Sequence, residues 1–301
     1  MTSVAERPTT VQHLTGGVVE YRLERRGDAA VVIMHGGHLR AGLTLDEDVF
    51  ADAGLTVLAP SRPGYGRTPL STGTTAAGFA DVTADVCRHL GIDRVAAVVG
   101  ISAGGPTAMA LAARHPDLVE RLILQSAQAP LTWPGRGTRL LAGLIFSPAT
   151  ERLTWGGVRG LLRRSPDVGL RMLLRDLSTV PARRAVAQLR PEHRAMLISL
   201  LCQMRSGEGF RNDLRRGVDV TAEIGQPTLV LASRRDGSVP FGHAEYLAGT
   251  IRRAELVESR SDSHFLEFGE DWPAVCDTIR AFLTAARPGD AAGPGDAAER
   301  G

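Results

Sequence analysis

The chain is 301 residues long, with 43% hydrophobic and 23% charged residues, close to an average globular protein. This composition excludes fully disordered, collagen-like and fibrous proteins, and the length fits one large α/β domain or two small ones. The net charge is only +2, which gives no support for a nucleic-acid partner.

The N-terminus and the cysteines point to a protein of the cytoplasm. The sequence has no run of about 18 apolar residues, and residues 1–8 lack the basic-then-apolar layout of a secretory signal. We therefore expect a cytoplasmic protein without a membrane span. Cys87, Cys202 and Cys276 lie far apart and outside any CxxC or Cys/His cluster, which argues against a disulfide framework or a zinc site. Buried small hydrophobic residues are the simpler interpretation.

Near-continuous apolar runs predict strands that are covered on both faces, and they alternate with helical patterns as in a parallel sheet of β–α units. The predicted strands are 29–35, 55–61, 94–100, 119–126 and 228–233, with weaker candidates at 18–23 and 254–258. Apolar residues at three-to-four spacing predict helices over 81–90, 103–115, 242–251 and 272–286.

The alternation stops between residues 130 and 222, where helical runs are punctuated by glycine and proline. We expect a helical insertion there, between core segments 1–129 and 223–286. The insertion holds 16 arginines against seven acidic residues, whereas the rest of the chain is acidic, and no lysine occurs anywhere. Residues 287–301 contain Pro-Gly-Asp-Ala-Ala twice and are expected to form a disordered, solvated tail.

Residues 100–104 read Gly-Ile-Ser-Ala-Gly, a G-x-S-x-G pattern between a predicted strand and a predicted helix. A serine on such a sharp turn takes a strained backbone, and small residues two positions away on either side avoid a collision. The free amides at the start of the helix also favour an oxyanion beside the serine. We therefore predict Ser102 as a catalytic nucleophile and the Ala103 amide as an oxyanion donor, with a structural glycine turn as the alternative.

A serine hydroxyl needs a general base, and the base needs a third group to hold its tautomer. Asp236 follows the predicted strand 228–233, and His264 lies 28 residues later, before the last helix. The chain order Ser102, Asp236, His264 is the one expected for a serine on a strand-to-helix turn of this kind. Asp262 is a rival carboxylate, but it is only two residues from His264 and more simply faces solvent or caps the turn.

The loop after the predicted strand 29–35 reads His35-Gly36-Gly37-His38. Glycines there let the backbone approach a substrate, so we predict the Gly37 amide as the second oxyanion donor, with His38 as the alternative donor and as a substrate-binding residue. An ordinary glycine loop is the other interpretation. We expect His35 to orient the loop by hydrogen bonds. The remaining histidines are expected to be solvated or capping: His13, His89, His115, His193 and His243.

Aromatic residues of the insertion are candidates for an apolar substrate pocket, namely Trp133, Phe146 and Trp155. Three methionines of the same segment share this candidacy: Met172, Met196 and Met204. Residues of this kind at helical spacing are more often core, and both interpretations stay open. The excess of arginine would attract an anionic substrate, an acyl-carrier protein or a lipid surface, whereas solvated arginine faces are the simpler explanation.

These features together resemble the α/β-hydrolase superfamily over residues 18–285: the His-Gly-Gly loop at 35–37, the segment SRPGYGRT at 61–68, the GISAGG turn, and the Asp236 and His264 loops. The resemblance implies an α/β-hydrolase fold with a mostly parallel eight-stranded sheet, a helical cap formed by residues 130–222, and a Ser-His-Asp triad. It also implies a pocket between sheet and cap, no cofactor and no metal. Ser102 separates the chain from branches that resemble epoxide hydrolases and haloalkane dehalogenases, whose nucleophile at this turn is aspartate.

The expected function is therefore that of a serine hydrolase acting on a small or medium, largely apolar carboxylic ester or lactone through an acyl-enzyme. C–C bond hydrolysis, acyl transfer and cyclisation use the same triad and remain alternatives, as does a ligand-binding protein on the same scaffold. The expected partner is a small-molecule substrate, and formation of a homodimer is left open.

Overall fold

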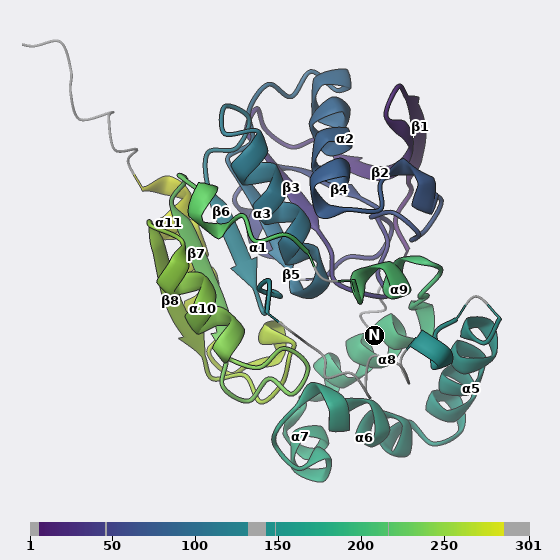
Figure 1. Cartoon of the computed structure of the whole chain (residues 1–301). Coiled ribbons are helices and arrows are strands. Elements are labelled where there is room, and N and C mark those ends of the chain that lie inside the picture. The colour runs from purple at the N-terminus through teal and green to yellow at the C-terminus, as the bar shows by residue number, and fades with distance from the viewer. Residues whose placement is uncertain (1–5, 46, 132–142, 148, 216, 286–301) are drawn as a thin grey trace, which may run out of the picture.

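The protein is described here as a computed structural model that covers residues 6–45, 47–131, 143–147, 149–215 and 217–285. These residues form an eight-stranded sheet in the order β1-β2-β4-β3-β5-β6-β7-β8, flanked by helices (Figure 1). The predicted tail 287–301 and Trp133 lie outside the described residues.

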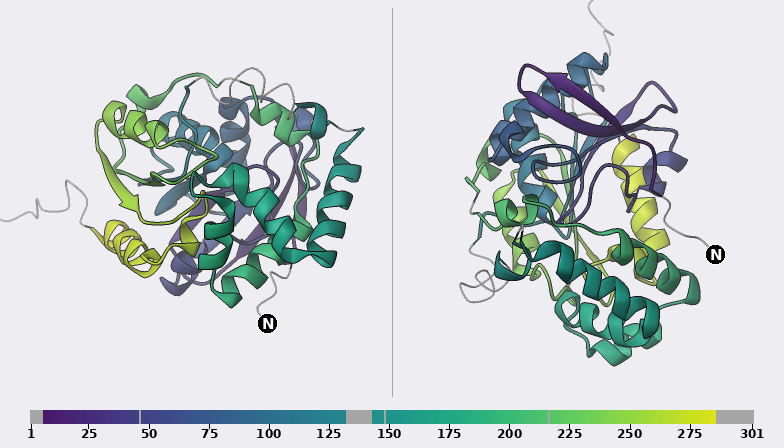
Figure 2. Two further views of the ribbon diagram at one scale, coloured as in Figure 1. Left: turned by 90° about the horizontal axis from the view of Figure 1, so that it is seen from below. Right: turned by 90° about the vertical axis from the view of Figure 1, so that its right-hand side faces the viewer.

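The sheet is mostly parallel, as predicted, because only the pairs β1–β2 and β2–β4 are antiparallel. Its strands are β1 (Thr10–Leu14), β2 (Gly17–Glu24), β3 (Ala30–Met34), β4 (Thr56–Pro60), β5 (Ala97–Ile101), β6 (Leu122–Gln125), β7 (Thr228–Ser233) and β8 (Ala254–Ser259). The antiparallel hairpin β1–β2 forms one edge of the sheet (Figure 2).

Two hydrophobic clusters cover the two faces of the sheet. One face packs against α2 (Ala76–His89), α3 (Gly105–Arg114) and α10 (Gly242–Thr250). The other face packs against α1 (Asp48–Asp52) and α11 (Trp272–Thr284). Apolar residues on both faces of the central strands explain why their sequences are near-continuous apolar runs and do not alternate with polar residues.

Helices α5 to α9 lie between β6 and β7 in the chain, and we call them the inserted helices. They are α5 (Glu151–Arg164), α6 (Pro166–Leu177), α7 (Ala182–Gln188), α8 (Pro191–Gln203) and α9 (Gly209–Asp213). Helices α5 to α8 share a third hydrophobic cluster, which also contains Leu39 and Leu43 after β3 and Phe265 after β8. The inserted helices therefore sit on loops at the carboxyl ends of the strands (Figures 1 and 2).

Two elements in the first fifth of the chain were not predicted. Strand β1 has a half-exposed, polar sequence and is held by the hairpin with β2, and α1 is only five residues long, too short to show a helical period. None of the helices in the described ranges is long and apolar enough to cross a membrane. Cys87 and Cys276 are buried and Cys202 is half-buried, and none of the three forms a disulfide.

Candidate active site

The candidate site lies at the switch point of the sheet, where the chain continues from one side of β3 to the other. Strand β3 has β4 on one side and β5 on the other, so the loops after β3 and β5 leave the sheet next to each other. In open α/β sheets, ligands bind in the crevice at such a switch point. Met34 of β3 pairs with Gly100 of β5. The His-Gly-Gly loop follows β3, and the Ser102 turn follows β5.

Ser102 has a backbone φ of 51°, a conformation that residues with a side chain rarely adopt. A Cβ atom on Gly104 would lie 2.0 Å from the carbonyl oxygen of Met34, and one on Gly100 would lie 2.7 Å from the Cβ of Ala108. Glycine is therefore required at both flanking positions, because helix α3 packs directly on the sheet there. The turn holds the Ser102 side chain at the strand end in a strained and fixed position.

His264 and Asp236 are joined by a hydrogen bond between Nδ1 of the histidine and Oδ2 of the aspartate, 2.7 Å long. Asp236 is 3% exposed, and its other oxygen accepts the backbone N–H groups of Ser238 and Val239 at 2.7 and 2.8 Å. These two amides fix the carboxylate in its loop after β7. The geometry is that of a carboxylate that orients an imidazole and leaves Nε2 for another partner.

The segment after α6 holds the aspartate and histidine loops together. Ser178 forms an antiparallel bridge with Asp236, and the Thr179 amide donates to the Arg235 carbonyl at 2.9 Å. The His264 amide donates to the Leu177 carbonyl at 2.8 Å. The inserted helices therefore take part directly in positioning the His264–Asp236 pair.

Ser102 and His264 line one cavity of about 890 Å³, between the strand ends and the inserted helices. Gly36, Gly37 and Ala103 line it as well. A Cβ built on Gly36 would lie 3.1 Å from the Cβ of Ser102, so the glycine loop passes directly beside the serine. The glycine loop, whose backbone is a candidate for stabilising an oxyanion, is thus adjacent to the serine.

The cavity walls are largely apolar and aromatic. Of the candidate pocket residues, His38, Phe146, Trp155 and Met204 line the cavity, as does Phe210, which the sequence analysis did not select. Other candidates do not line it: Met172 is 47% exposed, and Met196 packs against the cluster of the inserted helices.

His38 is held in place by a chain of hydrogen bonds. Its Nδ1 is 2.8 Å from Ser206 Oγ, which also accepts the indole N–H of Trp155 at 2.8 Å. The imidazole stacks on Phe210, with ring centroids 4.2 Å apart. Burial, together with the positive charge of Arg62, lowers the pKa of His38 to about 3. His38 is therefore neutral at physiological pH and serves as a hydrogen-bonding wall of the cavity.

An ion pair that the sequence analysis missed supports the glycine loop. Both terminal nitrogens of Arg62 contact the carboxylate of Asp213, at 2.5 and 2.8 Å, and Arg62 Nε donates to the His35 carbonyl at 2.8 Å. The Tyr65 hydroxyl donates to the same carboxylate at 2.6 Å. Burial alone would lower the pKa of Arg62, but the charge of Asp213 outweighs it and raises that pKa above its usual value. The segment SRPGYGRT marked Arg62 and Tyr65, but no motif marked their partner in α9.

His35 lies behind the loop, away from the cavity. Its Nε2 is 2.7 Å from Glu47 Oε1, and Glu47 in turn pairs with the buried Arg22. The His35 side chain does not line the cavity, and its role in orienting the loop stays a prediction.

The other histidines are also away from the cavity. Of the eight histidines, all within the described ranges, only His38 and His264 line it. His115 contacts Asp81. The prediction that His243 is solvated or capping is wrong, because His243 is buried and accepts the Ala129 amide through Nδ1.

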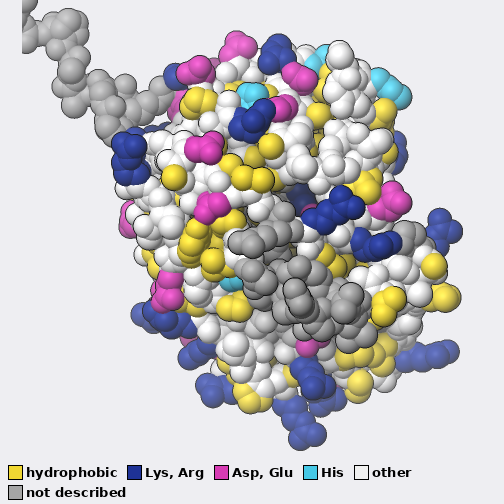
Figure 3. Space-filling model, viewed as in Figure 1, with side chains coloured by type: hydrophobic (Ala, Val, Ile, Leu, Met, Phe, Trp, Pro, Cys, Tyr) yellow, Lys and Arg dark blue, Asp and Glu magenta, His cyan; other side chains and the backbone are white. Residues whose placement is uncertain are grey.

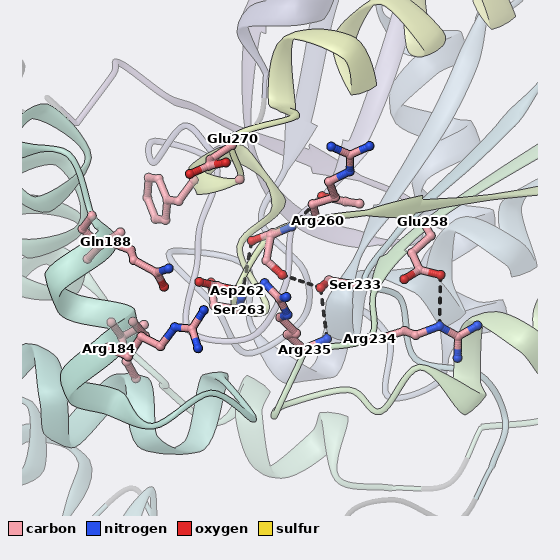
Figure 4. Close-up of a pocket in the computed structure, with 17 residues that line it drawn as sticks. Arg184, Gln188, Ser233, Arg234, Arg235, Glu258, Arg260, Asp262, Ser263 and Glu270 are labelled. Carbon is pink, nitrogen blue, oxygen red and sulfur yellow. Dashed lines mark hydrogen bonds and ion pairs between the residues drawn. The ribbon is translucent and has the colours of Figure 1, made fainter.

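Asp262, the rival carboxylate, faces a different pocket. It pairs with Arg235 and lines a separate hollow of about 400 Å³, together with Arg184 and Arg260 (Figure 4). This arrangement separates Asp262 from the His264–Asp236 pair. The described residues contain no group of three or more His, Cys, Asp or Glu side chains able to hold a metal ion.

Comparison with known proteins places these observations in a family context. Residues 30–147 match the family model of the alpha/beta hydrolase fold. The chain is 30% identical over 273 residues to the uncharacterized hydrolase YcgS of Bacillus subtilis, covering 89% of this chain and 95% of that protein.

Two further relatives have named activities. A 2-hydroxy-6-oxononadienedioate/2-hydroxy-6-oxononatrienedioate hydrolase from Pseudomonas sp is 34% identical over 257 residues, covering 80% of this chain and 83% of that protein. A pimeloyl-[acyl-carrier protein] methyl ester esterase from Aromatoleum aromaticum is 27% identical over 270 residues, covering 83% of this chain and 97% of that protein.

Proposed function

This chain belongs to the α/β-hydrolase superfamily, as its resemblance implied, and on that premise we propose that it is a serine hydrolase of carboxylic esters or lactones. The substrate class is small or medium and largely apolar. The observation that carries the proposal is that the strained Ser102 lines the same cavity as His264, whose Nδ1 is hydrogen-bonded to Asp236.

The proposed reaction has two halves. In the first, Ser102 Oγ attacks the substrate carbonyl while His264 Nε2 takes the hydroxyl proton, and the same proton passes to the departing alcohol. In the second, His264 removes a proton from water, which attacks the acyl-enzyme, and Ser102 recovers its proton as the acid leaves. Asp236 holds the imidazole with Nδ1–H toward its carboxylate and stabilises the positive charge on His264.

The oxyanion of each tetrahedral intermediate would lie between the amides of Gly37 and Ala103. The close approach of Gly36 to Ser102 supports this placement, because the next amide along the loop then lies beside the reacting carbonyl. Loss of one such donor typically costs about 10²- to 10³-fold in rate.

The cavity supports a neutral, largely apolar substrate. Its volume of about 890 Å³ and its aromatic walls suit a molecule of moderate size. In this proposal the inserted helices, within residues 130–222, act as the cap that closes the cavity, and Phe146 and Trp155 contact the substrate.

C–C bond hydrolysis is the second candidate, favoured by the relative from Pseudomonas that is named for hydrolysing a hydroxy-oxo-dienedioate. The esterase relative favours the first candidate. Both reactions would use the same nucleophile and base, so the substrate decides between them. Turnover of a 2-hydroxy-6-oxo-dienoate with a higher kcat/KM than any simple ester would support C–C hydrolysis.

Replacement of Ser102 by alanine tests the proposal. We expect the wild-type protein to hydrolyse p-nitrophenyl butyrate, and Ser102→Ala to lower kcat by at least about 10⁴-fold, because the covalent step is lost. Ser263→Ala is the matched control, since Ser263 lies one residue from His264 and outside the cavity. An unchanged far-ultraviolet spectrum would show that Ser102→Ala folds, and retained turnover in that variant would refute the assignment.

A further inference from the structure

Gln125 is a polar residue in an apolar position. It is the last residue of β6, and its backbone pairs with Ile101 of β5 and Leu231 of β7. Paired residues of neighbouring parallel strands point to the same face of a sheet. Ile101 and Leu231 belong to the cluster under α1 and α11, so the Gln125 side chain lies between two apolar neighbours.

The carboxamide of Gln125 is buried without a hydrogen-bond partner. The residue is 1% exposed, and among the described residues neither Nε2 nor Oε1 has a partner. Buried polar side chains are hydrogen-bonded in the great majority of proteins, because an unpaired amide loses its hydration without compensation. A glutamine with both ends unpaired therefore requires an explanation.

The position of Gln125 supplies one. It lines the same cavity as Ser102, and so does its neighbour Ile101. Ile101 directly precedes the serine and pairs with Gln125, so the carboxamide lies close to the serine turn. Nε2 and Oε1 are both covered, so the Gln125 side chain must turn toward the cavity to contact a group bound there.

We propose that Gln125 determines substrate specificity by binding a neutral substrate group that both donates and accepts a hydrogen bond, such as a hydroxyl or a carboxamide. This inference rests on the proposed hydrolase function and adds a substrate feature to it. A carboxylate, ketone or ester oxygen only accepts and would leave Oε1 of Gln125 unpaired. An ionised group would in addition be desolvated between Ile101 and Leu231.

The first test is stability, which is independent of turnover. Methionine has nearly the length of glutamine and no strong hydrogen-bonding group, so Gln125→Met removes the unpaired amide. We expect Tm without ligand to rise by about 2 to 4 °C. Gln128→Met, at a less buried position of the same cavity, is the matched control and should leave Tm unchanged. A lower or unchanged Tm for Gln125→Met would mean that the carboxamide is satisfied without substrate, and would overturn the proposal.

The second test compares polar and apolar acyl chains. The probes are p-nitrophenyl 3-hydroxybutyrate and 4-acetamidobutyrate, each against its hydrocarbon counterpart, the butyrate and the heptanoate. We expect Gln125→Met to lower the polar-to-apolar ratio of kcat/KM by about tenfold for at least one pair, the worth of one or two hydrogen bonds. An unchanged ratio for both pairs would contradict the proposal.

Binding without turnover separates this proposal from the proposed reaction. In the Ser102→Ala variant, at least one of the two polar esters should raise Tm more than its hydrocarbon counterpart does. In the double variant Ser102→Ala with Gln125→Met, this difference in Tm should disappear. If wild-type protein hydrolyses none of the four esters but this difference is seen, the reaction assignment fails and the role of Gln125 stands. If the esters are hydrolysed and no difference is seen, the role of Gln125 fails alone.

Discussion

His38 shows how one residue combines backbone strain, burial and hydrogen bonding. It has a φ of 67°, and its ring lies among Phe146, Trp155 and Phe210. Its lowered pKa means that the imidazole stays neutral in the folded protein at pH values where it is protonated in the unfolded chain. This difference links the stability of the protein to pH.

The unfolded chain binds a proton at this histidine below its ordinary pKa of 6.5, whereas the folded protein does so only near pH 3. The free energy of unfolding should therefore fall as pH decreases from 6.5 toward 3, by up to about 4 kcal/mol from this group. Asparagine tolerates positive φ and can still bond Ser206. We expect His38→Asn to flatten the pH dependence of urea unfolding between pH 6.5 and 4, and an identical slope in both proteins would count against this account.

At the residue scale, the sequence predicted those site residues that carry a motif or a fixed chain order. The glycines around Ser102 and the order of Asp236 and His264 were sufficient to select residues that the structure brings to one cavity or joins by a hydrogen bond. Gln125 was not selected, because a single polar residue at the end of the predicted strand 119–126 has no sequence signature. Its significance depends on the absence of nearby partners, which only the packing of three strands reveals.

At the scale of elements, α9 is tied to the loop after β4 by the buried Arg62–Asp213 pair. Their side chains are only 6% and 9% exposed. Removing one partner of a buried ion pair leaves an uncompensated charge and typically costs about 3 to 5 kcal/mol, whereas replacing both with apolar residues costs less. We expect Asp213→Leu to lower the free energy of unfolding by that amount, and Arg62→Met with Asp213→Leu to be more stable than Asp213→Leu alone.

Urea denaturation measures both variants. Asp85→Leu is a suitable control, because Asp85 forms an exposed pair with Arg88 within α2, and such pairs contribute at most about 1 kcal/mol. If Asp213→Leu were no more damaging than Asp85→Leu, the pair would not hold α9 in place. Loss of the pair should also lower kcat, since Arg62 anchors the carbonyl of His35 before the glycine loop.

Elements with a strong apolar period were predictable, and short or edge elements were not. Strands β5 and β7 are fully buried apolar runs, and both were predicted, β7 with its observed bounds. Helix α2 begins at Ala76, five residues before its predicted start, because Thr75 caps it through its side chain and the first turn is poor in large apolar residues. The pairing of Ser178 with Asp236 could not be predicted from the sequence. It is a backbone bridge between segments 58 positions apart, and backbone contacts of this kind leave no pattern in the side chains.

At the scale of the whole molecule, arginine is concentrated in the segment that packs over the strand ends. Arginine side chains project from the lower part of the molecule, where α6 and α7 lie (Figure 3). Exposed examples are Arg163, Arg175 and Arg184, and Arg175 is one of the residues that line the cavity. Such a surface creates a positive field that salt screens.

The field should act on charged probes and leave neutral ones unaffected. For the mono-p-nitrophenyl ester of adipic acid, we expect kcat/KM to fall about threefold or more as ionic strength rises from about 0.01 M to about 0.15 M. For neutral p-nitrophenyl butyrate, the same change should have little effect. Equal salt responses for the two esters would show that the arginines are solvated faces without influence on substrate approach.

Covalent labelling tests the central claim most directly, because a fluorophosphonate reacts far faster with a serine activated by a base than with an ordinary serine. We predict that intact-mass spectrometry of the wild-type protein shows one phosphonyl group, that peptide mapping places it on Ser102, and that His264→Ala slows labelling by at least about 10³-fold. A folded wild-type protein that stays unlabelled, or that carries the label on another serine, would contradict the account.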